Sequence, residues 1–368
     1  MLKPLHWLAG IPSWVRRVTP AQLISPPRSG LIGLVELPAH DGLLPTEDVQ
    51  WWYWTGHLEG TPRGAPGSVR SFGFEMVFFV FDSFEVIRAT LGQAALTDRS
   101  AQKFHYGESL DLGLPERLSG RFVLDGDNGR FQASGADGLD HLSAKLQTGE
   151  SFDLVLRSHG PPALHYGGFP HPLRCGGFTY YYSRPRMSVS GTVTADGVVY
   201  EVRGDAWFDR QYGQLFQLIE RGWQWFALSL EDGTRVMLFD FPAGKEQVEN
   251  FGAVISPDGA YRLVPPERFE VKVLATWKSP KTNTEYPARW AVKVDDYSFE
   301  VAPWVSDQEL SPSRSVRLWI GPEYWEGACD VLEPGTSRVV GKAYVELNGY
   351  ADSGAIARSL AFLSELFD

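Results

Sequence analysis

The chain has 368 residues, of which 43% are hydrophobic and 13% aromatic, and its formal net charge is −11. This acidic balance excludes nucleic acid as an expected partner, because phosphate binding needs a basic surface. The length suits two domains that each bury a core, and no apolar run is long enough to span a bilayer. Cys175 and Cys329 lie far apart in the sequence and are expected to be buried free thiols.

The N-terminal segment is short, apolar and aromatic. Pro12 interrupts it, and Arg16 and Arg17 follow the apolar stretch instead of preceding it, so a secretory signal fits poorly and a cytoplasmic location is expected. Two interpretations stay open. Trp7 and Trp14 beside the two arginines suit contact with a membrane surface. The alternative, which we prefer, is an arm packed on the adjacent domain.

The stretch VQWWYWTGHLEG at 49–60 is typical of a strand. Alternation places Tyr53 and His57 on one face and Trp52 and Trp54 on the other. Because both faces are apolar, we expect both to be buried.

A second strand, RSFGFEMVFFVF at 70–81, is also apolar on both faces and carries Glu75 in its middle. An isolated glutamate there is costly unless it is hydrogen-bonded, paired with a cation or protonated. Glu75 is therefore a second candidate acid of the site, although a structural partner is the interpretation we favour.

The chain from 121 to 158 reads as an antiparallel meander with hairpin turns such as DGDNG. The next segment, 159–177, is rich in Gly and Pro and carries His159, His165 and His171. A loop of this kind usually covers a site or joins two sheets. Its histidine spacing matches no zinc pattern, so no metal is predicted.

The stretch 178–241 holds the most informative residue, Asp209. Alternation groups aromatic residues around it on three strand faces: Phe178, Tyr180 and Tyr182; Asp205, Trp207 and Asp209; Trp223, Trp225 and Ala227. If these faces point inward, Asp209 lies in an aromatic pocket, where burial raises its pKa and makes it a general acid for an apolar substrate. The alternative is an ion pair with Arg210 or Arg203, and we weigh the two evenly.

After Arg186 further alternating runs, separated by ADG, EDG and PDG turns, indicate a second β-domain. The last segment is helical, because Ile356, Leu360 and Leu363 recur at helical spacing after a Ser353 cap. We expect this helix to close an end of a barrel or cover an edge. No G-x-S-x-G, P-loop or dinucleotide fingerprint occurs, which leaves cofactor-free chemistry or plain binding.

Several motifs in this order resemble one family. They are WWYWTGHL at 51–58, AWFDRQYG at 206–213, GWQWFALSLEDGTRVMLFDF at 222–241, YWEGA at 324–328 and GKAYVELNGY at 341–350. From about Gly33 to Ala351 the chain is similar to the lipocalin-like family of carotenoid 1,2-hydratases and AttH-type proteins, which also contains kievitone hydratase-like proteins and Diels-Alderases.

The resemblance implies an all-β fold of two consecutive lipocalin-like antiparallel β-barrels, with no metal or nucleotide required. The expected segments are an N-terminal arm (1–29), a first barrel (30–186), a second barrel (187–352) and a C-terminal helix (353–368).

Three departures from the family pattern bear on the activity. Gln50 stands where the family has Glu, and Tyr212 stands where it has Trp. Tyr180 and Tyr182 occupy the strand on which the hydratases are expected to carry a His and Trp pair. Hydration of a carotenoid end is thereby placed in doubt, while the acid Asp209 is kept.

We expect a cofactor-independent enzyme that acts on an apolar isoprenoid or polyketide, with its site at or between the domains. Asp209 would protonate a C=C bond for hydration, isomerisation or cyclisation, and ring faces would stabilise the cation. The predicted catalytic residues are Asp209, Tyr180 and Tyr182, and the predicted substrate-binding residues are Trp52, Tyr53, His57, Glu75, Trp207, Trp223, Trp225 and Glu326.

Two other functions stay open. In a pericyclase the aromatic walls would fold a polyene, and Tyr53 or His57 would activate a dienophile carbonyl. In a carrier, the barrel would bind a hydrophobic ligand without converting it. For individual residues such as Trp52 and Trp223, ordinary core packing is the alternative interpretation.

Overall fold

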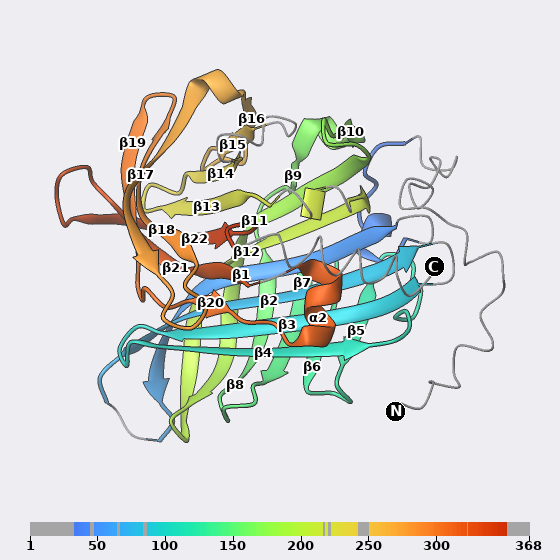
Figure 1. The fold of residues 1–368 in the computed structure, drawn as a ribbon, viewed down its shortest axis with the longest axis horizontal. Helices are drawn as coiled ribbons and strands as arrows, with labels where there is room; N and C mark the ends of the chain where they lie inside the picture. Colours follow the sequence, from blue (N-terminus) through green and yellow to red (C-terminus); the bar gives the residue numbers. More distant parts are fainter. Residues whose placement is uncertain are drawn as a thin grey trace, which may run out of the picture.

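Two antiparallel sheets, each curled into a barrel-like shape, form the described part of the chain (Figure 1). The structure is a computed structural model that describes residues 33–351 apart from 45–47, 65–66, 84–86, 216–217, 220–221, 242–249 and 322. The expected N-terminal arm and C-terminal helix lie outside these residues. None of the helices within them has the length and apolar character needed to cross a membrane.

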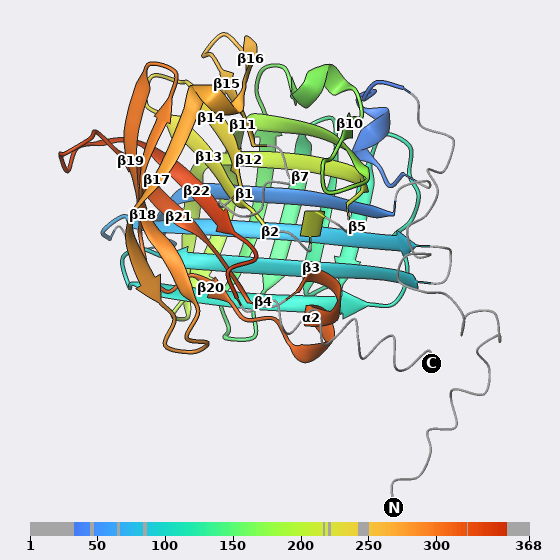
Figure 2. The ribbon, with the colours of Figure 1, turned by 45° about the horizontal axis from the view of Figure 1, so that its top comes forward.

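The first sheet contains most of the N-terminal half. Its strands, in spatial order, are β4 (Lys103–Asp111), β3 (Ile87–Asp98), β2 (Arg70–Ser83), β1 (Val49–Pro62), β12 (Val198–Gln214), β11 (Phe178–Ala195), β8 (Ser151–Ser158), β7 (Leu139–Lys145), β6 (Phe131–Ala136) and β5 (Phe122–Gly126). The short strands β9 (Ala163–Leu164) and β10 (His171–Pro172) pair with β11. In both ribbon views β1 to β4 cross over β5 to β8, so the sheet folds onto itself around a core (Figure 2).

The second sheet follows in the chain. Its strands, in spatial order, are β16 (Tyr261–Val264), β15 (Phe251–Ile255), β14 (Arg235–Asp240), β13 (Gln224–Leu230), β22 (Val339–Leu347), β21 (Tyr324–Leu332), β19 (Tyr297–Pro303), β18 (Glu285–Val294) and β17 (Phe269–Lys278). The two-residue strand β20 (Glu309–Leu310) pairs with β21. Helical elements whose bounds lie within the described residues are α2 (Arg314–Ile320) and the 3-10 turns η4 (Ala39–Asp41), η5 (His165–Gly168) and η6 (Pro266–Arg268).

The change from one sheet to the other comes later than we expected. The predicted boundary between residues 186 and 187 falls inside β11, and β12 pairs with both β11 and β1. The ADG turn near residue 196 joins this long hairpin within the first sheet instead of opening a second domain. The first sheet therefore runs to Gln214, and the second begins with β13.

Three separate cores explain the large number of aromatic residues. One lies inside each curled sheet, and the third lies between the two sheets. On β1, Trp52 and Trp54 belong to the first core, whereas Trp51 and Tyr53 belong to the core between the sheets. The prediction that both faces of this strand are buried is confirmed, because each face packs against a different layer.

The two sheets approach each other closely where β2 meets β21. A Cβ added at Gly73 would lie 2.4 Å from the Cβ of Ala328, so only glycine fits at this point of β2. Helix α2 packs nearby on the same side of the first sheet, with the ring of Trp319 5.1 Å from that of Phe81. Small residues and aromatic contacts thus fix the spacing of the sheets, and with it the space between them. In this structure Cys329 is a buried free thiol, as expected, whereas Cys175 is only half-buried.

Candidate active site

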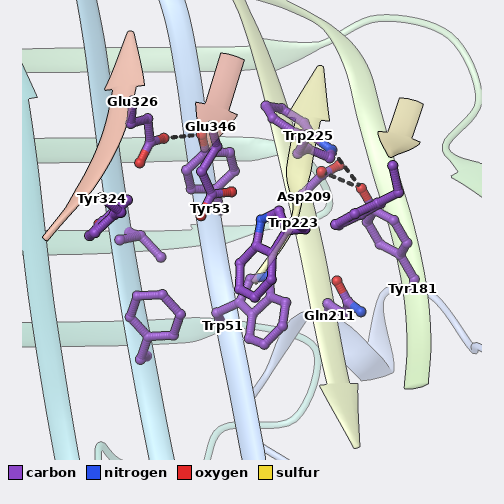
Figure 3. A pocket seen from close by; sticks show the side chains of 13 residues that line it. Trp51, Tyr53, Tyr181, Asp209, Gln211, Trp223, Trp225, Tyr324, Glu326 and Glu346 are labelled. Carbon is purple, nitrogen blue, oxygen red and sulfur yellow. Dashed lines mark hydrogen bonds between the residues drawn. The ribbon is translucent and has the colours of Figure 1, made fainter. Parts of the chain in front are cut away.

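A pocket lies between the two sheets, within the core that they share (Figure 3). Its lining comes from β1, β2, β11 and β12 of the first sheet, from Trp223 just before β13, and from β13, β14, β21 and β22 of the second sheet. The lining residues are Trp51, Tyr53, Val77, Phe79, Tyr181, Asp209, Gln211, Trp223, Trp225, Phe239, Tyr324, Glu326 and Glu346. The free space among these side chains is about 30 Å³, which is room for roughly two water molecules.

Asp209 lies at one end of this pocket and is 3% exposed. Its Oδ1 accepts hydrogen bonds from Trp207 Nε1 (2.6 Å) and Ser183 Oγ (2.5 Å), and its Oδ2 accepts one from Tyr181 Oη (2.5 Å). Burial raises the pKa of Asp209 to about 7, although the three donors favour the charged form. The carboxyl is therefore placed to hold and release a proton near neutral pH.

The alternative of an ion pair with a neighbouring arginine does not describe Asp209. The Arg210 guanidinium points to the opposite face of β12, where it donates to the Gln50 side chain and the Gly42 carbonyl. Arg203 is exposed on the surface.

The tyrosine that contacts Asp209 is Tyr181, not Tyr180 or Tyr182 as we expected. In the register of β11 and β12, Ser183 lies opposite Asp209, and Tyr182 lies opposite Arg210. Side chains alternate between faces, so Tyr180 and Tyr182 point into the first barrel and Tyr181 points into the pocket. The YYY run hides this choice, because either alternation gives an aromatic face.

On the opposite face the two predicted tyrosines have structural partners. Tyr182 Oη donates to Asp41 Oδ1 at 2.5 Å, and the Tyr180 ring stacks on Tyr212 with 5.0 Å between centroids. Trp52 also belongs to this side, since its Nε1 donates to the Asp41 carbonyl at 2.8 Å. These residues stabilise the first barrel and do not reach the pocket.

A hydrogen-bonded chain runs behind Asp209 from η5 and β16. Ser183 Oγ lies 2.8 Å from His165 Nε2, and His165 Nδ1 lies 3.2 Å from Tyr261 Oη. His165 is fully buried, and burial lowers its pKa to about 3, so the imidazole is neutral. Its ring also packs on Tyr181, with 4.1 Å between centroids. The loop 159–177 thus does contact the site, as its composition indicated.

Two glutamates lie at the other end of the pocket. Glu326 on β21 and Glu346 on β22 are direct cross-strand partners, and both line the cavity. Tyr53 Oη donates to Glu326 Oε1. Burial raises the pKa of Glu326 well above its usual value and that of the half-buried Glu346 to about 7.

Glu75 forms a third carboxyl behind this pair. It is fully buried, and neither of its carboxylate oxygens has a hydrogen-bond partner among the described residues. Burial and the nearby charge of Glu346 raise its pKa well above the usual value. The sequence left three explanations for a buried Glu75: a hydrogen bond, a pairing cation or a retained proton. The retained proton fits this environment, and the structural partner that we favoured does not.

The other predicted residues divide between the pocket and its surroundings. Trp223 and Trp225 line it, and Trp207 borders it through the bond to Asp209. His57 does not line it: its Nε2 lies 3.1 Å from the Ala343 carbonyl, its ring packs 5.0 Å from that of Trp304, and burial lowers its pKa to about 3.

Sequence reasoning missed some lining residues, above all Glu346, Tyr324, Gln211 and Tyr181. Alternation within GKAYVELNGY does place Glu346 on the same face as Tyr344, but only the pairing of β21 with β22 brings it opposite Glu326. The part of the chain described here contains no group of three or more His, Cys, Asp or Glu side chains arranged to hold a metal ion.

Comparisons with known proteins identify the family and the solved structures that this chain resembles. A family model described as AttH-like matches residues 32–350. The crystal structure of a protein described as AttH from Nitrosomonas europaea shares 25% identity over 89% of this chain and 100% of its own, with a TM-score of 0.73. Kievitone hydratase from Nectria haematococca shares the fold at 17% identity over 87% of this chain and 94% of its own, with a TM-score of 0.65. A comparison with curated proteins gave no match. The match to the family model covers most of the sequence, and the chain belongs to the AttH-like family.

Proposed function

We propose that this protein is a cofactor-independent enzyme that protonates a C=C bond of an apolar isoprenoid or polyketide substrate, with Asp209 as the general acid. The observation that carries the proposal is a carboxyl group, buried among aromatic rings, whose pKa is raised to about 7. A general acid is most effective when its pKa lies near the working pH. The reaction that follows is hydration, isomerisation or cyclisation.

The aromatic lining supports a cationic intermediate. Protonation of an alkene at its less substituted carbon leaves a positive charge on the other carbon. The negative ring faces of Trp225, Tyr53 and Trp51 border the pocket and attract such a charge. The carboxyl groups of Glu326 and Glu346 add further negative potential when ionised.

The size of the pocket sets a condition on substrate binding. A free space of about 30 Å³ holds water and no isoprenoid chain. In this proposal the substrate therefore displaces lining side chains. Rotation of large residues such as Trp51, Trp223 and Phe239 would open the space that the substrate needs.

Kievitone hydratase supports the chemistry only in outline, since its likeness to this chain lies in the fold. Its name describes a hydratase, so the architecture is compatible with the addition of water. The pericyclase alternative is weaker for this chain, because Tyr53 donates its hydroxyl to Glu326 and His57 lies outside the pocket lining. A carrier has no need of several carboxyls in an apolar pocket, where each one is costly to bury.

The test is incorporation of deuterium from solvent. A total lipid extract of the organism that encodes the protein is incubated with enzyme in D₂O and compared by mass spectrometry. Protonation on carbon by Asp209 adds one deuterium, whereas a pericyclic closure or binding adds none. We expect Asp209→Asn to reduce this incorporation by about 100-fold or more.

Asp140 provides the matched control for this variant. It is also buried, its carboxylate also accepts from a tryptophan N–H (Trp54 Nε1, 2.9 Å), and burial raises its pKa to about 7. It lies in the first barrel, away from the pocket lining, so Asp140→Asn should retain the wild-type rate. A wild type that transfers no deuterium, or an Asp209→Asn variant as active as Asp140→Asn, would contradict the proposal.

A further inference from the structure

Asp209 is closed off from solvent on the side that faces the pocket. It is 3% exposed, and the side chains around it there are aromatic. An acid that gives its proton to carbon must take up another before the next turnover. An apolar molecule in the pocket excludes the water that could supply this proton, so the proton needs a route through the protein.

The three side chains that donate to Asp209 differ in what lies behind them. Trp207 ends its branch, because an indole N–H can donate but cannot accept. Behind Tyr181 lie another indole N–H and, again, Ser183. Behind Ser183 lies His165, whose Nε2 is 2.8 Å from Ser183 Oγ. A neutral imidazole can give a proton at one nitrogen while it accepts one at the other. The Ser183 branch therefore continues away from the pocket.

The hydrogen bonds of this branch all point toward Asp209. A serine hydroxyl has one hydrogen, and Ser183 gives it to Asp209 Oδ1 at 2.5 Å. Ser183 Oγ consequently accepts from His165 Nε2. Burial lowers the pKa of His165 to about 3, so the ring is neutral and its Nδ1 carries no hydrogen. Nδ1 then accepts from Tyr261 Oη, which lies 3.2 Å away.

Tyr261 is the outer end of the branch. Ser183 and His165 are fully buried, whereas Tyr261 is half-buried and so reaches the surface. It lies on β16, which is the edge strand of the second sheet and stands at the rim of the molecule (Figure 2). The branch thus starts at solvent, passes through the η5 segment and ends at the buried carboxyl.

We infer that Tyr261, His165 and Ser183 form a proton relay that carries protons from solvent to Asp209. The use of this relay in turnover rests on the proposed function, whereas the path itself can be measured without a substrate. His165 and Tyr261 are positioning residues, because they act through Asp209 and do not line the pocket.

Only protons move in this step. Ser183 Oγ gives its hydrogen to the Asp209 carboxylate and receives one from His165 Nε2. His165 Nδ1 receives a hydrogen from Tyr261 Oη, and the Tyr261 oxygen takes a proton from solvent. The sum is one solvent proton added to Asp209. A half-turn of the imidazole ring then brings its protonated nitrogen back toward Ser183 and resets the relay.

The test is the rate at which the Asp209 carboxyl exchanges its proton for deuterium. Infrared spectroscopy follows the C=O stretch of the protonated carboxyl after mixing with D₂O below about pH 7, where Asp209 holds its proton. Loss of this band in Asp209→Asn assigns it. His165→Gln keeps a hydrogen-bonding side chain, but an amide does not readily give one proton while it accepts another. We expect His165→Gln and Tyr261→Phe to slow the exchange by about 100-fold or more.

Two controls separate the relay from a general effect on the fold. His57→Gln is the matched variant, because His57 is also buried, its pKa is also lowered to about 3 and its Nε2 contacts the Ala343 carbonyl, away from this branch. It should leave the exchange of Asp209 unchanged. The buried carboxyl of Asp140, whose pKa is also about 7, is the internal standard and should exchange at one rate in all variants.

A His165→Gln variant whose Asp209 band exchanges at the wild-type rate overturns the inference, and so does equal slowing of the Asp140 band. If His165→Gln fails to fold by circular dichroism, Tyr261→Phe decides alone, since it removes the outer hydroxyl and leaves the buried imidazole in place.

Deuterium transfer to the total lipid extract distinguishes this inference from the proposed function. His165→Gln that is first equilibrated in D₂O should transfer one deuterium per enzyme at the wild-type rate and later ones slowly, and added imidazole should restore the later turnovers. Loss of the first transfer as well would mean that His165 only holds Asp209 in place, and would overturn the relay. A wild type that exchanges Asp209 through His165 but labels no lipid defeats the proposed function and leaves the relay standing.

Discussion

Tyr181 and Asp209 are joined across two paired strands by a hydrogen bond of 2.5 Å from Tyr181 Oη to Asp209 Oδ2. The same hydroxyl lies 3.3 Å from Trp225 Nε1, which donates to it. Tyr181 therefore links the acid of the site to one of its aromatic walls. The hydrogen bond from the Tyr181 hydroxyl favours the ionised carboxylate and so opposes the effect of burial, which raises the pKa of Asp209.

Replacing Tyr181 with Phe should raise the pKa of Asp209 further, because one donor to the charged form is lost. The acid then stays protonated to higher pH, and the alkaline limb of the pH–rate profile for deuterium incorporation should move upward by about one pH unit. Tyr182→Phe is the matched control, because that hydroxyl serves Asp41 in the first barrel. An identical profile for both variants would show that Tyr181 does not tune the acid.

The pH dependence of the wild type follows from Asp209. This acid must be protonated to transfer its proton, so activity is lost as pH rises through about 7. We expect the rate of deuterium incorporation to be highest below this pH and to fall above it. A rate that stays constant from pH 5 to pH 9 would exclude this role of Asp209.

Stability should also depend on pH, with a sign opposite to that of ordinary carboxylates. The folded-state pKa values of Asp209 and Asp140, both about 7, exceed the usual aspartate value of 3.8. The folded state thus binds these protons more tightly than the unfolded state does. This tighter binding contributes to the free energy of unfolding at low pH, and the contribution is lost as pH rises from about 4 through about 7. Each acid contributes a slope of up to about 1.4 kcal/mol per pH unit.

Urea unfolding at several pH values measures this slope for the variants. Asp209→Asn and Asp140→Asn should each flatten it, although only Asp209→Asn should affect activity. A slope unchanged by both substitutions would mean that neither acid is protonated in the folded protein at neutral pH.

How far the sequence predicts the molecule depends on the kind of information. The strand pattern and the ordered motifs predict two antiparallel barrels, and alternation within 49–60 predicts a strand buried on both faces. Asp209 is also recognisable, because the aromatic residues around it are close in the chain. The partner tyrosine is not, since three consecutive tyrosines fit either face and only the register of β11 with β12 selects Tyr181. Glu346 is found only by its pairing with Glu326, which joins segments that have separate sequence contexts.

Arg210 offers a prediction about folding instead of catalysis. Its guanidinium is fully buried, lies 3.7 Å from the Trp52 ring centroid and donates to the Gln50 side chain at 2.7 Å and to the Gly42 carbonyl at 3.0 Å. The single ammonium group of lysine cannot reproduce the several fixed N–H donors of the planar guanidinium. Arg210→Lys should therefore lower the free energy of unfolding by about 2–4 kcal/mol. The exposed Arg203, changed to Lys, should alter it by less than about 0.5 kcal/mol. Equal effects of the two substitutions in urea unfolding would contradict this view of Arg210.

The spacing of the sheets at Gly73 and Ala328 can be tested by a double-mutant cycle. Gly73→Ala places a methyl group 2.4 Å from the Ala328 Cβ, and neither atom can move without its strand. We expect a loss of about 1–3 kcal/mol in unfolding free energy, because overpacking displaces backbone. Ala328→Gly removes the opposing methyl group, so adding it to Gly73→Ala should restore much of that loss, whereas alone it should be mildly destabilising. The coupling energy between the two positions, measured by urea unfolding of all four proteins, should then be about 1 kcal/mol or more. Additive effects would mean that β2 and β21 do not meet at these residues, and the pocket that depends on their spacing would have to be placed differently.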